Sequence, residues 1–187
     1  DVANKGSCKS TLLAELDLPL DPERPLLVSL PAGADEEVAD ALSEAIGMMG
    51  NIDTSLVVVG AGQDAPSDKR LEQAAQAHPE YARYLDGADE RMRHRLLAAA
   101  DGVLFASEST RADVGILAAQ RYGAAPVARA TASSSDMVVD CDAEGQTGTG
   151  FLFEASDAEA LTGAAGRAVS LIRSEHWGQV RRRMMRL

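Results

Sequence analysis

Short runs of consecutive hydrophobic residues alternate along this chain with longer segments in which hydrophobic residues recur at helical spacing. The runs predict β-strands that are buried on both faces, and the longer segments predict amphipathic helices. The predicted strands occupy residues 26–30, 56–59, 81–85, 103–105, 126–128 and 151–153. The predicted helices occupy residues 4–16, 35–49, 68–78, 90–99, 114–121, 158–172 and 176–185.

Strands that alternate with helices at this spacing form βαβ units, which assemble into a parallel sheet with helices on both faces. The expected fold is therefore α/β and Rossmann-like, with a doubly wound, mainly parallel sheet. The chain has 187 residues, enough for one such domain and too few for two, so we expect a single domain over residues 1–187. Ligands bind at the carboxyl ends of the strands in such sheets, which directs attention to the loops after Leu30, Val59, Leu85, Phe105 and Ala128.

The charge balance narrows the partners that the chain can bind. It has 18 basic and 29 acidic residues and a net charge of −11, which repels nucleic acid and anionic membrane surfaces. The basic cluster at residues 181–183 and Arg186 lies at the end of a predicted helix, where the helix dipole favours cations. The chain has no signal segment and no membrane-length hydrophobic run, and Cys8 and Cys141 lack CxxC spacing. We therefore expect a cytoplasmic protein with no nucleic-acid or membrane partner.

Motifs for cofactors and metals are weak. Gly60-Ala61-Gly62 follows a predicted strand but lacks the third glycine of a dinucleotide-binding turn. The three histidines have no spacing typical of metal ligands, and the serines lie in no nucleophile elbow. The serine run at residues 133–135 predicts a flexible loop. We expect no cofactor and no metal.

Five short motifs, in order, carry a resemblance to a known family. They are His94-Arg95 before Ala100-Asp101, Arg121-Tyr122-Gly123 before Pro126-Val127, Arg129-Ala130-Thr131, Asp136-Met137-Val138-Val139-Asp140, and Gly148-Thr149-Gly150-Phe151. With these motifs the chain resembles the C-terminal, nucleotide-sugar-binding half of the glycogen and starch synthases. Those proteins are retaining glycosyltransferases of the GT-B type, in which two Rossmann-like domains face each other.

The resemblance implies a role in glycogen biosynthesis, where the family transfers a glucosyl group from ADP-glucose to an α-1,4-glucan. It also implies an N-terminal GT-B domain as the partner of this one. The chain begins at Asp1 without a methionine, so we expect a fragment of a longer polypeptide from which that N-terminal domain is missing.

The family's donor-binding cations have no counterpart at the matching positions. In the family the first strand ends in Ser-Arg, and the arginine acts with a nearby lysine on the donor pyrophosphate. Here Ser29 is retained, but Leu30 takes the place of the arginine and Asp35 falls near the place of the lysine. A diphosphate requires positive charge, which Leu30 does not supply and Asp35 opposes.

The remaining donor positions also depart from the family pattern. Ala88 replaces a tyrosine that faces the adenine, and Thr110 replaces the acid that contacts the donor sugar. Asp113 replaces a glycine at a phosphate-binding helix start, and Thr131 begins Thr-Ala-Ser in place of Thr-Gly-Gly. The resemblance thus implies a degenerate donor site with no assignable catalytic residue, near Ser29, Leu30, Gly60, Gly62, Ala88, His94, Thr110, Arg129 and Thr131.

Three functions remain open. The substitutions favour a pseudoenzyme domain that is not catalytic alone and that binds ADP-glucose or glucan weakly at most. The order and spacing of the family motifs favour an active donor-binding half that uses atypical residues. The third is a doubly wound regulatory or interaction module whose resemblance to the family is accidental.

Overall fold

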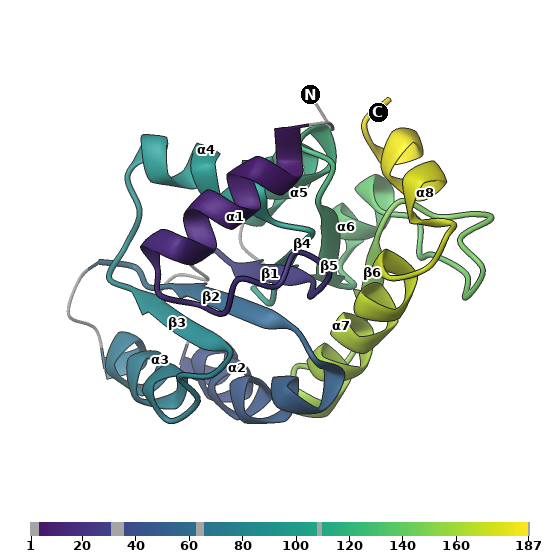
Figure 1. Cartoon of the computed structure of the whole chain (residues 1–187). Coiled ribbons are helices and arrows are strands. Elements are labelled where there is room, and N and C mark those ends of the chain that lie inside the picture. The colour runs from purple at the N-terminus through teal and green to yellow at the C-terminus, as the bar shows by residue number, and fades with distance from the viewer. Residues whose placement is uncertain (1–3, 31–35, 63–65, 108–109, 187) are drawn as a thin grey trace.

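A computed structural model describes residues 4–30, 36–62, 66–107 and 110–186, without the side chains of residues 110–113. Within these ranges six parallel strands form one sheet in the order β3-β2-β1-β4-β5-β6 (Figure 1). The strands are β1 (Leu26–Ser29), β2 (Ser55–Val59), β3 (Ala82–Leu85), β4 (Gly102–Phe105), β5 (Ala125–Arg129) and β6 (Phe151–Phe153). The predicted α/β, Rossmann-like fold with a parallel sheet is confirmed.

Helices cover both faces of the sheet, as Figure 1 shows. One layer consists of α1 (Lys5–Glu15), α4 (Glu90–Ala99) and α5 (Thr110–Arg121). The other consists of α2 (Glu36–Met48), α3 (Pro66–Gln76) and α7 (Ala158–Ile172). The 3-10 helix η2 (Met49–Ile52), α6 (Ala132–Met137) and α8 (Trp177–Met184) complete the described elements.

The continuous hydrophobic runs form strands here because both faces of the sheet are buried. In β1, Leu26 and Val28 belong to the hydrophobic cluster beneath the layer of α1, α4 and α5. Leu27, between them, belongs to the cluster beneath α2, α3 and α7. Successive strand side chains point to opposite faces, so a strand covered on both sides buries all of its side chains, as the four residues of β1 show.

The order of the strands fixes where a ligand can bind. β1 pairs with both β2 and β4, so the winding of the chain reverses direction between β1 and β4. Connections leave these two strands toward opposite faces, which opens a crevice outside their carboxyl ends. The described residues that follow β1, β2, β3, β4 and β5 lie along this edge, called the carboxyl edge below.

One expectation for the secondary structure was wrong. The serine run at residues 133–135 lies within the short helix α6 and is not a loop. A capping box explains the difference, because the Thr131 hydroxyl accepts a hydrogen bond from the backbone N–H of Ser134. Serine is a poor residue in the middle of a helix but a good one in its first turn.

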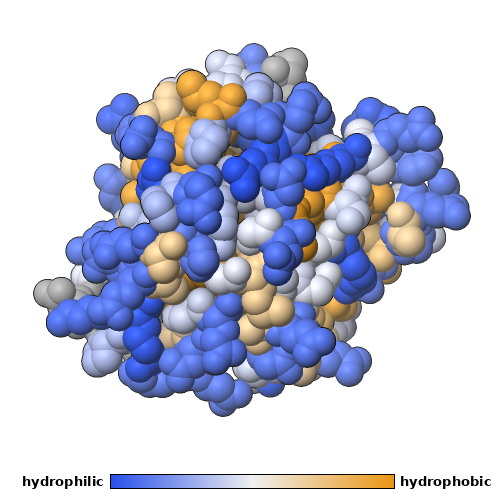
Figure 2. Space-filling model, turned by 60° about the horizontal axis from the view of Figure 1, so that its bottom comes forward, coloured by the Kyte–Doolittle hydropathy of each residue, from blue (hydrophilic) through white to orange (hydrophobic). Residues whose placement is uncertain are grey.

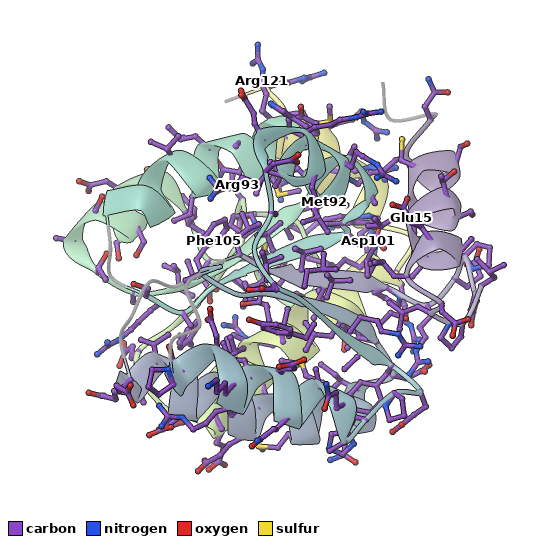
Figure 3. All side chains as sticks on the ribbon, turned by 90° about the vertical axis from the view of Figure 1, so that its left-hand side faces the viewer. Glu15, Met92, Arg93, Asp101, Phe105 and Arg121 are labelled. Carbon is purple, nitrogen blue, oxygen red and sulfur yellow. The ribbon has the colours of Figure 1, made fainter. Side chains whose placement is uncertain are left out.

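Two buried lysines of α1 hold together the opposite edge of the sheet, the amino edge. Lys9 forms an ion pair with Asp101, 2.8 Å between Nζ and Oδ2, and the same oxygen accepts a hydrogen bond from the backbone N–H of Leu26. Lys5 donates to backbone carbonyls at the ends of α4 and α5. Figure 3 shows Asp101 at one end of β4 and Phe105 toward the other end. The ion pair therefore joins α1 to β1 and β4 far from the carboxyl edge.

The surface is mainly polar. The face in Figure 2 is mostly hydrophilic, with hydrophobic residues in small separate areas. Among the described residues, no helix combines the length and the hydrophobicity that crossing a membrane would require.

We predict that Lys9→Met destabilises the fold, because it leaves the buried Asp101 carboxylate without its counter-charge. Removing one partner of a buried ion pair costs about 3–5 kcal/mol, and we expect the free energy of unfolding in urea to fall by about that amount. Ser10→Met, at the exposed neighbouring position, is the matched control and should change it by less than about 0.5 kcal/mol. Equal unfolding midpoints for Lys9→Met and the parent protein would contradict this role of the ion pair.

Candidate functional site

The loops after β2 and β3 touch each other at the carboxyl edge. Gly62 and Gly87 both have positive φ angles, +72° and +78°. A Cβ on Gly87 would lie 3.4 Å from the Cα of Gly62, so the two loops pack backbone against backbone. The structure thereby places two of the expected site residues, Gly62 and Ala88, in neighbouring loops.

A tyrosine of the chain itself occupies the space beside Gly60. A Cβ on Gly60 would lie 2.0 Å from the hydroxyl oxygen of Tyr84 in β3. The missing side chain of Gly60 therefore makes room for this ring, which packs directly against the backbone at Gly60.

The next backbone N–H group, that of Ala61, donates to a buried carboxylate. The N–H of Ala61 donates to both carboxylate oxygens of Asp68, each at 3.1 Å. Asp68 lies in the first turn of α3 and is only 5% exposed. A glycine-containing turn after a strand binds phosphate through such N–H groups. Here that group already has an anionic partner within the chain.

The end of β1 is hydrophobic. Ser29 is buried in the strand, and Leu30 packs against the hydrophobic cluster that contains Phe105. Ala88 packs against the same cluster. Aliphatic groups thus occupy the two positions where the resemblance implies an arginine and a tyrosine.

Two residues at the start of α6, Thr131 and Ser134, hydrogen-bond each other. The Thr131 N–H donates to Oγ of Ser134 at 2.8 Å, and the Ser134 N–H donates to Oγ1 of Thr131 at 3.1 Å. Oγ of Ser134 also donates to the backbone carbonyl of Arg129, at 2.6 Å. These three bonds join the start of α6 to the end of β5, and they use two backbone N–H groups at the start of the helix.

The remaining expected site residues divide into three groups. Arg129 ends β5 and is half-buried at the carboxyl edge. His94 lies elsewhere, because a 2.6 Å hydrogen bond joins its Nδ1 to the hydroxyl of Tyr122, which follows α5 at the amino edge. Asp35 and the side chains of Thr110 and Asp113 lie outside the described part of the chain.

Sequence reasoning missed Asp68, Tyr84 and Ser134. The sequence could have indicated the role of Ser134, since this residue stands three positions after Thr131 in the pattern of a capping box. Asp68 and Tyr84 had no such indication, because their contacts with the loop after β2 depend on how α3 and β3 pack. The described residues include no group of three or more histidine, cysteine or acidic side chains placed to hold a metal ion.

Comparison with solved structures gives the same fold over the whole chain. The catalytic domain of Starch Synthase IV from Arabidopsis thaliana superposes with a TM-score of 0.82 at 24% identity, covering 100% of this chain and 40% of that one. The C-terminal domain of a group 1 glycosyltransferase from Francisella tularensis gives a TM-score of 0.61 at 17% identity, covering 92% of this chain and 90% of that domain. The protein thus has the Rossmann-like fold of a GT-B glycosyltransferase domain.

Sequence comparison identifies the family. A glycogen synthase from Anaeromyxobacter dehalogenans is 33% identical over 92% of this chain, and one from Leptothrix cholodnii is 33% identical over 98%. Starch synthase 2 of Arabidopsis thaliana is 31% identical over 97% of this chain. The chain spans 36% and 38% of those two glycogen synthases and 23% of that starch synthase. No family model matches the chain. The chain belongs to the glycogen and starch synthase family, as a glycosyltransferase domain that corresponds to part of its relatives.

We predict that Gly60→Ala lowers the free energy of unfolding by about 1–3 kcal/mol, as expected when a methyl group enters packed space. If the Tyr84 ring causes this loss, adding Tyr84→Leu should reduce the further cost of Gly60→Ala to below about 0.5 kcal/mol. The control is Gly163→Ala in α7, where a Cβ meets nothing within 4 Å and alanine is the better helix former. Additive effects of the two substitutions would show that Tyr84 does not occupy this space.

Proposed function

We propose that this chain is the donor-side domain of a glycogen or starch synthase-like glycosyltransferase whose donor site is degenerate. On this proposal the domain keeps the family fold but does not hold ADP-glucose, and it is not catalytic alone. It serves as a folded scaffold next to an N-terminal GT-B domain in a longer chain.

The main support is that the chain's own side chains occupy the anion-binding groups of the carboxyl edge. Asp68 accepts from the N–H of Ala61, and Ser134 and Thr131 satisfy each other. Each charge-assisted hydrogen bond to a phosphate contributes about 1.5–3 kcal/mol. A site with a micromolar dissociation constant has a total binding free energy of about −8 kcal/mol. Losing several such bonds therefore removes most of that binding free energy.

Charge and shape support the same conclusion. Leu30 is aliphatic at the position where an arginine would bind the pyrophosphate. Ala88 is aliphatic at the position where an aromatic ring would stack on the adenine. In the loop after β3, Asp86 and Asp89 add negative charge to a chain of net charge −11. The Starch Synthase IV structure, which has this fold, was solved bound to ADP and acarbose. The fold can therefore hold ADP, and we assign its loss here to the side chains at the carboxyl edge.

We predict that calorimetry detects no binding of ADP or ADP-glucose at the carboxyl edge of this chain. The measurement is a titration of the folded chain with each ligand up to millimolar concentration. A dissociation constant below about 100 µM, which corresponds to roughly −5.5 kcal/mol, would contradict the degenerate site and favour an active domain with atypical donor contacts.

Restoring the family residues should restore affinity for ADP. The variant carries Leu30→Arg, Asp35→Lys, Ala88→Tyr, Thr110→Glu and Asp113→Gly. We expect the two cations to contribute most, since the pyrophosphate charge dominates binding, and Ala88→Tyr to add about 0.5–1.5 kcal/mol by stacking. Thr110→Glu should affect turnover more than affinity, and only with the partner domain present.

The control for this variant introduces the same two cations at other exposed positions, as Leu117→Arg with Glu44→Lys. Its affinity for ADP should stay unmeasurable. This result would show that the position of the new cations, and not the overall charge of the chain, restores binding. If the restored variant folds and its affinity does not exceed that of the control, the residue-by-residue correspondence with the family is wrong.

A further inference from the structure

A cavity of about 650 Å³ lies at the amino edge of the sheet, at the opposite end of the strands from the donor-site loops. Its walls come from the first half of α1, the segment before β1, and the junction of α7 with α8. Figure 1 shows α1 and α8 on the side of the molecule where both chain ends lie. The volume falls within the range of small-molecule sites in proteins.

Most charged groups in the cavity wall already have partners. Lys9 and Asp101 neutralise each other as the buried ion pair described above. Arg173 forms an ion pair with Asp53. The Lys5 ammonium donates to the carbonyls of Leu97, Ala98 and Tyr122, at 3.1, 3.3 and 3.0 Å. Carbonyls satisfy its hydrogen bonds, and the nearest carboxylate that acts on its charge, Asp101, is already in an ion pair with Lys9.

Arg181 is the cation in this wall without a hydrogen-bonded partner. Its aliphatic stem packs over Gly123, where a Cβ would lie 3.0 Å from Cγ of the arginine. Its guanidinium lies over the Trp177 ring, with Cζ 6.0 Å from the centroid. Within the described part of the chain the guanidinium makes no hydrogen bond or ion pair, although it has five N–H donors. The packing of the stem thus holds a half-buried arginine at the cavity, and its guanidinium has no partner among the described residues.

The two positive charges disfavour each other. The pKa of Lys5 is lowered to about 8, mainly by burial; the charge of Asp101 opposes this shift and the charge of Arg181 adds to it. Burial also lowers the pKa of Arg181, again opposed by Asp101. Charges held out of water need a partner of opposite sign. A bound anion would supply it to both groups at once.

We propose that this cavity is a binding site for a small phosphate monoester that carries hydroxyl groups. Arg181 hydrogen-bonds the phosphate, because a guanidinium fork matches phosphate oxygens, and Lys5 contributes its charge. The Trp177 ring and Ile172 supply an apolar wall for the carbon skeleton. The exposed carboxylates of Asp21 and Glu23 line the cavity as well and accept hydrogen bonds from the hydroxyls. This proposal does not depend on the state of the donor site.

The chain's single tryptophan, Trp177, reports on the cavity directly. The experiment titrates inorganic phosphate and glycerol 3-phosphate at constant ionic strength and follows tryptophan fluorescence, with calorimetry in parallel. We expect saturable binding with dissociation constants of about 1 mM or lower, tighter for the ester. Arg181→Gln should weaken binding at least tenfold, while Arg182→Gln, at the exposed neighbouring position, should leave it within twofold.

Absence of saturable binding, or equal losses in Arg181→Gln and Arg182→Gln, would overturn the proposal. If Arg181→Gln does not fold, Arg181→Lys replaces it, because it keeps the charge but loses the fork; we then expect weaker binding of both probes, and unchanged affinity would count against the site. Weak binding of ADP through this cavity would disappear in the Arg181 variants, whereas binding at the donor loops would persist.

Discussion

Burial of the central strands on both faces is the constraint on which the structure depends. β1 and β4 have fully buried hydrophobic side chains on either side, so helices must cover both faces and no functional side chain can project from the middle of the sheet. The strand ends are the positions left for polar chemistry. At the amino edge the chain uses them for stability, through the ion pair of Lys9 with Asp101. At the carboxyl edge, side chains of the chain itself bind backbone N–H groups of the loops after β2 and β5.

The contacts at the carboxyl edge share one physical character. Asp68 and Ser134 each accept a hydrogen bond from a backbone N–H group, and Tyr84 packs against the backbone at Gly60. A donor phosphate would have to displace a buried carboxylate at Ala61, which costs the hydrogen bonds already made and opposes the ligand's charge. On the proposed function, the contacts that stabilise the fold at this edge also reduce its capacity for a nucleotide.

Much of the fold could be predicted from the sequence, because each buried parallel strand is a run of consecutive hydrophobic residues. Residues 26–30 and 56–59 predicted β1 and β2 to within one residue at each end. Helix α6 was missed because serine has a low helix propensity, and a capping interaction between Thr131 and Ser134 overrides it. Leu30 and Ala88 were identified through the family resemblance, and the structure places both against the hydrophobic cluster. The contact of Asp68 with Ala61 could not be predicted, since it joins residues through tertiary packing.

The central claim is that the chain's own side chains bind the N–H groups of Ala61, Thr131 and Ser134 at the carboxyl edge and keep a nucleotide from them. Amide resonances of these loops test this claim most directly. The measurement is a two-dimensional ¹⁵N–¹H NMR titration with ADP-glucose, reading the backbone amides of Ala61, Ala88, Thr131 and Ser134. The account predicts that these four amides keep their positions at millimolar ligand, because their hydrogen bonds and packing stay internal. Saturable, concerted shifts of the Ala61 and Thr131 amides would show that a nucleotide sugar enters the edge and would contradict the account.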